Sequence, residues 1–268
     1  MSSSPLRVAA LILSALLLLL ASRALSQLPA DADGAAILRA LHDRDAGDRL
    51  RAEVRMTLTD GRGARRVREL ELVMARFDGG LRTRMRFRHP ADVAGTALLT
   101  IDHDEGEDEQ WLHLPALGRT ARIRGGGRAR SFLGSDLSFA DLSRREPGEW
   151  IAEVRDRDAT VDGTPAWHLA LRPRDAEVRE ATGYARAELW VAKESLLVLR
   201  SKGWMEGGHV KYVMAEDVAR VDGVWVARRL VARTVRAGEV ESETVLERRA
   251  LRFDDPSVTE GLFVPAAL

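Results

Sequence analysis

The residues most able to support metal binding or catalysis lie between positions 102 and 136. An acidic run, DHDEGEDE at 102–109, offers carboxylate oxygens of the kind that bind calcium. In a calcium loop of the EF-hand type the sixth residue is glycine and the twelfth is glutamate. Here Gly106 is the fifth residue and His113 the twelfth. The spacing therefore predicts a solvated acidic turn and no metal site.

A serine nucleophile is the second possibility. Ser135 directly follows Gly134, but the G-x-S-x-G motif of the hydrolase nucleophile elbow is not present, because the second glycine is missing. No cysteine occurs, and the six histidines lack the spacing of zinc ligands. No histidine can be assigned to Ser135 as a base. We expect a protein that is not an enzyme and needs no cofactor, and loss of an activity in Ser135→Ala would be required to argue otherwise.

A basic run without any acidic residue lies just before this serine. It consists of Arg119, Arg122, Arg124, Arg128 and Arg130. These arginines could form a solvated strand face and loop, or they could dock on anionic headgroups or on an acidic patch of a partner, each adding ~1 kcal/mol near a charged membrane surface. The 41 basic and 41 acidic residues of the whole chain cancel. This balance gives no reason to expect nucleic acid as a partner.

Two extended stretches must position the first of these arginines. Gln110 to Leu114 alternates apolar and polar residues, and Pro115 ends it because proline cannot donate to a sheet ladder. Leu117 to Arg124 then resumes in extended conformation. This pattern predicts a strand pair.

A mobile covering segment is expected to follow the strand pair. Gly125, Gly126 and Gly127 give the backbone unusual freedom, so we predict a hinge there. Ser138 and Asp141 have the spacing of a capping box, which predicts the start of a short helix. We therefore predict that this segment forms a lid over the sheet.

Most of the remaining chain alternates apolar and charged residues with a period of two, which is typical of half-buried strands. The clearest example is residues 81–88, where Leu, Thr, Met and Phe alternate with four arginines. A short helix is expected at 35–42. We expect a mainly β fold with about 11 antiparallel strands. The candidate strands are 50–59, 65–77, 81–88, 96–101, 110–114, 117–124, 150–157, 166–172, 184–192, 196–204, 209–216, 223–236 and 240–252.

The predicted sheet is so large that two or three short helices cannot cover its apolar face. Antiparallel sheets leave one face in water only if the other face is packed. Either the sheet rolls up on itself, or it leaves an apolar hollow that a ligand fills. The pattern therefore favours a binding protein.

Three segments together carry a family resemblance: PADVAGTALLTID at 90–102, WLHLPALGRTARI at 111–123 and SFLGSDLSFADL at 131–142. They resemble the outer-membrane lipoprotein-sorting proteins of the LolA/LolB-like superfamily. The resemblance implies a curved antiparallel half-barrel with helices plugging its open side and a cavity for acyl chains. It also implies an arginine that latches the lid, a role that cannot be assigned to one position here because arginines are so numerous.

The cavity wall is expected to be apolar and aromatic. A sixteen-carbon chain needs on the order of 10 kcal/mol of shelter from water, at about 0.8 kcal/mol per methylene. The alternative for each candidate is that its side chain packs in the hydrophobic core and contacts no ligand. The candidates are Met85, Phe87, Leu99, Trp111, Leu114, Phe132, Leu133, Phe139 and Trp190.

The N-terminus predicts export. Arg7 precedes an apolar run from Val8 to Ala21, and Ala24-Leu25-Ser26 fits a signal-peptidase site. The run is shorter than the ~20 residues of a spanning helix. We expect a signal peptide at 1–26 and one monomeric LolA-like domain at 27–268. Without cysteine the protein cannot carry a lipid anchor at a lipobox, so we expect the periplasm.

Two functions remain open. The first is a carrier that shields the acyl chains of lipoproteins or of free lipid on the way to the outer membrane. The second is an interaction module of an envelope transporter, of the RND or the ABC type, which carries no lipid. The first predicts a bound acyl chain, and the second predicts a filled, dry interior.

Overall fold

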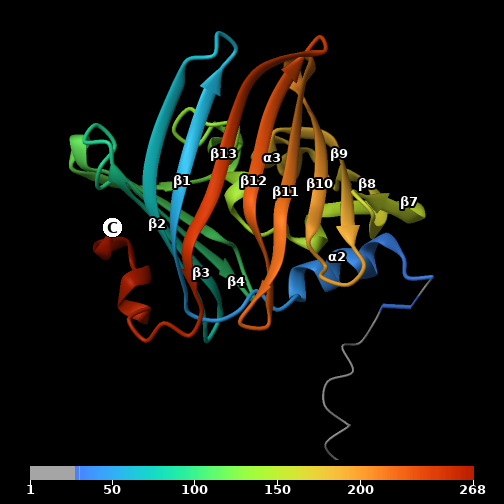
Figure 1. Ribbon diagram of the computed structural model, residues 1–268, viewed down its shortest axis with the longest axis horizontal. Coiled ribbons are helices and arrows are strands. Elements are labelled where there is room, and N and C mark those ends of the chain that lie inside the picture. The colour runs from blue at the N-terminus through green and yellow to red at the C-terminus, as the bar shows by residue number, and fades with distance from the viewer. Residues whose placement is uncertain (1–27, 30) are drawn as a thin grey trace, which may run out of the picture. The chain divides into compact units, whose positions relative to one another are not determined.

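One antiparallel sheet of thirteen strands dominates the described part of the chain, which comprises residues 28, 29 and 31–268 of a computed structural model (Figure 1). The expected signal peptide at 1–26 lies outside these residues. The strand order is β6-β5-β4-β3-β2-β1-β13-β12-β11-β10-β9-β8-β7. The first and last strands therefore pair in the middle, and β6 and β7 are the two edges of an open sheet.

The curved, mainly β architecture is confirmed, with thirteen strands where about 11 were expected. Residues 33–268 form one unit. The strands are β1 Leu50–Asp60, β2 Arg65–Phe77, β3 Gly80–His89, β4 Ala97–His103, β5 Glu109–Leu114, β6 Arg119–Ile123, β7 Trp150–Val161, β8 Thr164–Pro173, β9 Tyr184–Ala192, β10 Val198–Met205, β11 His209–Val221, β12 Val224–Arg236 and β13 Glu239–Arg252.

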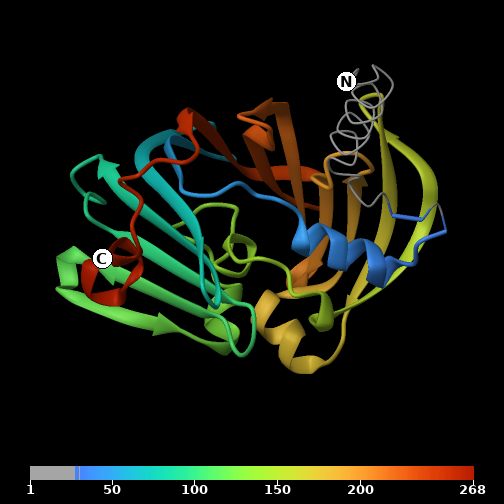
Figure 2. The same cartoon turned by 90° about the horizontal axis from the view of Figure 1, so that it is seen from below.

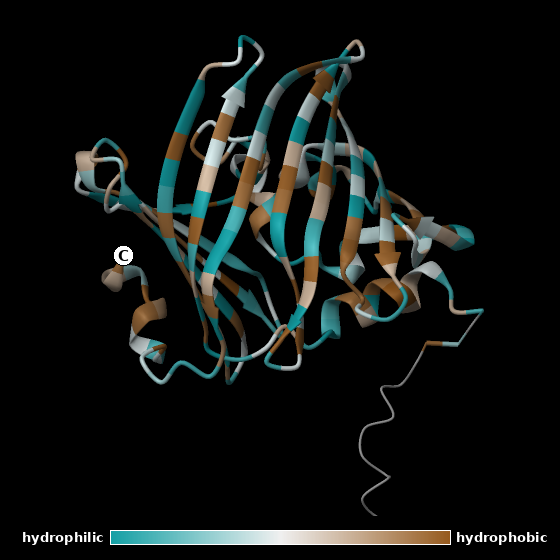
Figure 3. Ribbon diagram, in the orientation of Figure 1, coloured by the Kyte–Doolittle hydropathy of each residue, from teal (hydrophilic) through white to brown (hydrophobic). Residues whose placement is uncertain are grey.

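Alternation of residue types explains why these segments are strands. Along β1 every second residue from Leu50 to Leu58 is buried, and its neighbours are exposed or half-buried. Figure 3 shows the same alternation as bands of hydropathy across the strands. The turn at Asp162-Gly163 has positive φ at both residues, and so does the turn at Asp222-Gly223. This is the backbone of the tight hairpin turns that Asp-Gly favours.

Two α-helices are present among the described residues. Helix α2, Gly34–Asp43, begins at Asp33, whose carboxylate accepts a hydrogen bond from the Ala36 N–H at 2.7 Å. It packs on β7, where Gly34 lies so close to Ala152 that a Cβ would sit 2.5 Å from the Ala152 carbonyl oxygen. Helix α3, Ala176–Thr182, was not expected from the sequence. No helix in the described ranges is long and apolar enough to cross a bilayer.

The chain between the two sheet edges crosses one face of the sheet. Figure 2 shows this lime-coloured connection lying between the green and the orange flanks of the sheet. We call its residues 131–142 the plug, and the sheet face that contacts them the inner face. The opposite, outer face of β2 and β4 is covered by the C-terminal segment, which buries Val258 and Phe263 against Val73 and Leu99.

The plug is not the helix that its capping box predicts. The box itself is present: the Ser138 N–H donates to Asp141 Oδ2 at 2.8 Å, and the Asp141 N–H donates to Ser138 Oγ at 3.2 Å. However, it starts only a single 3₁₀ turn, Ala140–Leu142. Ser143 is already extended, because the chain must run on to the sheet edge at β7. The short helix predicted here is therefore reduced to this one turn.

Candidate functional site

The inner face of the sheet and the plug enclose an apolar cavity of about 30 Å³. Its wall comes from β1, β2, β3, β13 and the plug, and it consists of Val54, Met56, Leu70, Leu72, Met85, Phe132, Leu137, Leu142, Leu246 and Arg248. A cavity of this size holds about one water molecule, whereas pockets for small molecules measure roughly 300–1,000 Å³. The plug contributes three apolar side chains to this wall, those of Phe132, Leu137 and Leu142.

Aromatic rings fix the plug in this position. Phe132 is 2% exposed and lies 5.8 Å from the ring of Phe87 and 5.6 Å from that of Phe139, the latter edge to face. Aromatic pairs at such separations add ~1 kcal/mol beyond the area they bury. The plug therefore behaves as part of the core on this side of the sheet.

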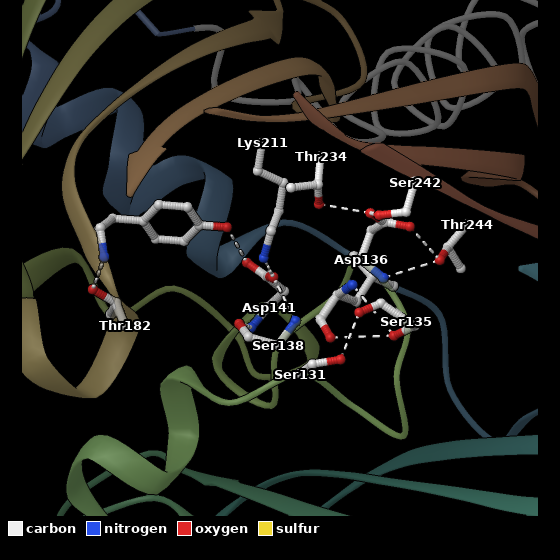
Figure 4. A network of polar contacts seen from close by, with 12 residues as sticks. Ser131, Ser135, Asp136, Ser138, Asp141, Thr182, Lys211, Thr234, Ser242 and Thr244 are labelled. Carbon is white, nitrogen blue, oxygen red and sulfur yellow. Dashed lines mark hydrogen bonds and ion pairs between the residues drawn. The ribbon is translucent and has the colours of Figure 1, made fainter. Parts of the chain in front are cut away.

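A buried carboxylate ties the plug to two strands (Figure 4). Asp136 accepts hydrogen bonds from the hydroxyls of Thr234 on β12 at 2.6 Å and of Thr244 on β13 at 2.7 Å. Ser242 on β13 donates a third, at 2.5 Å. Three hydroxyl donors compensate for the removal of this carboxylate from water. The sequence interpretation treated Asp136 only as a neighbour of Ser135 and missed this role.

A second carboxylate ties the plug to β9 and β11. Asp141 accepts from Lys211 Nζ at 2.6 Å and from the Tyr184 hydroxyl at 2.7 Å. Burial acts to raise the pKa of Asp141, but the charge and hydrogen bond of Lys211, together with the Ser138 N–H and Tyr184, outweigh burial and hold the pKa below its ordinary value. Lys211 is itself only 4% exposed. The pair is therefore a buried salt bridge between plug and sheet.

Side chains of the opposite flank hold the main chain of the plug. Arg68 on β2 donates from Nη1 to the Leu133 carbonyl at 2.8 Å, and Gln110 on β5 donates from Nε2 to the Phe139 carbonyl at 2.8 Å. The plug is held by both flanks of the sheet.

The acidic run is only partly the solvated turn that its composition suggests. Residues 104–107 are exposed, but Asp102 is buried and accepts from the Arg144 N–H at 3.2 Å, just beyond the plug. Burial, and then the charge of Asp108, raise the pKa of Asp102 to about 7. This carboxyl therefore titrates near neutral pH.

The predicted cavity residues divide into groups according to the sheet face on which they lie. Five of them are in the core cluster that contains the plug: Met85, Phe87, Phe132, Leu133 and Phe139. Met85 and Phe132 also line the cavity directly.

The other four lie away from the plug. Leu99 and Trp111 pack on the outer face with the C-terminal segment. Trp190 stacks on His168, with ring centroids 4.2 Å apart, and packs against a third cluster. Leu114 is half-buried at the end of β5. Neighbouring strand residues point to opposite faces, so Leu98 faces the plug and Leu99 does not.

The basic run is also divided. Arg122 lies 3.6 Å from Glu107, and Arg128 adds its charge to the surroundings of the half-buried Glu146. Arg119, Arg124 and Arg130 are exposed. The three glycines of the expected hinge form part of a 3₁₀ helix, Gly125–Ala129, which packs against α3. A Cβ on Gly126 would lie 2.9 Å from Glu180 Oε1. The hinge stays a prediction.

Solved structures share this fold over most of the chain. A structure described as an outer membrane lipoprotein-sorting protein domain, from Vibrio parahaemolyticus, has 27% identity and a TM-score of 0.75, over 86% of this chain and 95% of that one. A DUF1329 family protein from Desulfovibrio piger has 26% identity and a TM-score of 0.76, over 88% and 97%. A LolA superfamily protein from Nitrosomonas europaea has 16% identity and a TM-score of 0.64, over 88% and 100%, which is a likeness of fold alone.

Sequence comparison agrees with the likeness of structure. No curated protein matches this sequence. A family model whose description reads "-like: Uncharacterized protein" matches residues 79–268, more than half of the chain. The protein therefore belongs to this family, and it has the fold of the LolA-like outer-membrane lipoprotein-sorting proteins.

Proposed function

We propose that the protein is a non-enzymatic carrier that shelters acyl chains on the inner face of its sheet and releases the plug to admit them. The observation that supports this proposal most directly is the content of the hollow. Phe132, Leu137, Phe139 and Leu142 of the plug occupy the apolar space that an acyl chain would need. The Vibrio parahaemolyticus structure, with 27% identity and its lipoprotein-sorting description, supports a role of this class.

An exchange of plug for acyl chain is energetically reasonable. Leaving an acyl chain in water costs ~0.8 kcal/mol per methylene, and exposing the side chains of the plug costs ~2 kcal/mol for each large one. The two apolar terms offset one another when a chain of some ten or more carbons replaces the plug. The anchors of the plug are polar contacts, which water can replace once the plug has moved.

The place and direction of transport follow from the same proposal. We propose that the protein works in the periplasm, moving lipoproteins or free lipid toward the outer membrane, with an inner-membrane transporter of the RND or ABC type as donor. A carrier with a closed resting state would protect its apolar hollow between donor and acceptor.

The filled interior also favours one alternative. If the plug never leaves, the sheet is a rigid interaction module of an envelope transporter. Native mass spectrometry of the mature protein purified gently from periplasm tests the two. A bound species with acyl chains, displaced by a fluorescent fatty-acid analogue, supports the carrier. A homogeneous unliganded mass that does not respond to the analogue supports the interaction module.

A further inference from the structure

Three arginines from separate parts of the chain lie close enough for their charges to interact, and one of them lines the plugged hollow. Arg44 is the C-cap residue of α2, Arg144 lies two residues beyond the plug, and Arg248 is on the inner face of β13. None of them belongs to the basic run at 119–130.

Arg248 is the member of the cluster that reaches the hollow. Its side chain lines the apolar cavity together with Leu142 and Leu246, and its Nη1 donates to the Ala227 carbonyl at 2.6 Å. Within the described residues no carboxylate forms an ion pair with it. A guanidinium group has five N–H donors, and an unpaired charge beside apolar surface is costly.

The other two arginines bring further positive charge, and Asp102, Glu146 and Asp43 offset part of it near Arg144. Burial, then the charge of Arg248, then that of Arg144 lower the pKa of Arg44 to about 10, and Asp45 opposes this only weakly. Arg44 donates to the Asp45 carbonyl at 3.2 Å. The backbone N–H of Arg144 binds Asp102. Three neighbouring cations repel one another, and an anion bound among them would relieve that repulsion.

We propose that Arg248, with Arg44 and Arg144 near it, binds the anionic headgroup of a lipid whose acyl chain lies in the hollow. This inference rests on the proposed carrier function and specifies its cargo as an acidic amphiphile. The guanidinium fork matches the two oxygens of a phosphate or carboxylate group, which a neutral headgroup does not offer. The apolar wall and the cationic cluster together match the two ends of such a lipid.

Two fluorescent lipids with identical acyl chains test the proposal on the mature protein: a phosphatidic acid and a diacylglycerol. Wild type is expected to bind the phosphatidic acid about tenfold or more tightly than the diacylglycerol. Arg248→Gln is expected to remove most of that preference, measured as the ratio of the two affinities. Arg249→Gln is the matched control, because Arg249 is the next residue of β13, is exposed and pairs with Glu247 at 3.5 Å.

Each other outcome counts against a defined part of the proposal. Equal affinity for the two lipids in wild type overturns the headgroup site and leaves the carrier intact. Failure of both lipids to bind overturns the carrier itself. Inorganic phosphate that competes as well as a short-chain phosphatidic acid would show a site for the free anion and overturn the lipid assignment. If Arg248→Gln melts at a much lower temperature than wild type, Arg44→Gln and Arg248→Lys provide the same comparison.

Discussion

The Lys211 ammonium group on β11 donates to the Asp141 carboxylate on the plug at 2.6 Å, across 70 residues of sequence, and both side chains are almost completely buried. The pair joins the part of the chain that fills the hollow to the sheet behind it. Any movement of the plug must break or move this salt bridge. The contribution of this salt bridge to the free energy of unfolding can be measured separately from that of the apolar packing of the plug.

Removal of one partner of this pair should be strongly destabilising. We expect Lys211→Met to lower the free energy of unfolding by about 3 kcal/mol or more, because it leaves the Asp141 carboxylate buried with fewer donors. Urea unfolding measures the change. Lys193→Met is the control: Lys193 pairs with Asp158 at 3.3 Å on the surface, where such a pair contributes less than ~1 kcal/mol. Equal effects of the two substitutions would contradict the proposed role of the buried pair.

The anchor at Asp136 should control local opening of the plug. We expect Asp136→Ala to speed hydrogen exchange in residues 131–142 by at least about tenfold, since three hydroxyls lose their acceptor. Exchange in β1 should change much less. Asp104→Ala removes an exposed carboxylate paired with Arg76 and provides the control. Uniformly faster exchange in plug and strands would mean that Asp136 stabilises the whole sheet and not the plug.

Stability should depend on pH through Asp102. Its pKa is about 7 in the folded protein against an ordinary 3.8, so the folded state keeps the proton over a pH range in which the unfolded state has lost it. Stability therefore falls as the pH rises from about 4 to 7, by up to roughly 4 kcal/mol. Asp102→Asn should flatten this dependence and be more stable than wild type at pH 8. Chemical denaturation at pH 5 and pH 8 tests this, and an unchanged slope in Asp102→Asn would contradict it.

Phe132 offers a way to separate stability from access to the hollow. Phe132→Ala should cost about 3–5 kcal/mol and enlarge the inner cavity, so that a fluorescent fatty-acid analogue binds faster. Phe77→Ala is the matched control, because the Phe77 ring packs at a tilt against that of Phe263 on the outer face, with centroids 5.6 Å apart. The control should lose stability without a change in binding rate. Faster binding in both variants would indicate general loosening.

Local patterns predicted the sheet well because strands leave a local signature. The alternation of residues 81–88 and the Asp-Gly turns identify strands and hairpins without any knowledge of the rest of the chain. Helix α3 was missed although its ends are marked by Asp175, which accepts from the Val178 N–H, and by Gly183 at φ 76°. Its seven residues are too short for a clear helical period.

The site was harder to predict because its contacts are long-range. The capping box of Ser138 and Asp141 was visible in sequence, but nothing local indicates that Asp141 also binds Lys211, or that Asp136 binds Thr244, 108 residues away. The sequence also does not show which residues of each strand face the plug. Leu98 and Leu99 are both apolar, and only the pairing of β4 with its neighbours decides which one faces the plug.

The central claim is that the plug must leave the inner face before an acyl chain can bind. Because the chain has no cysteine, an Asp136→Cys, Thr244→Cys double variant can lock the plug to β13 by an oxidised disulfide, whose formation is checked by mass. Binding of a fluorescent fatty-acid analogue is then measured before and after reduction. We predict no binding in the oxidised form and recovery of binding on reduction. Equal binding in the two forms would contradict the account.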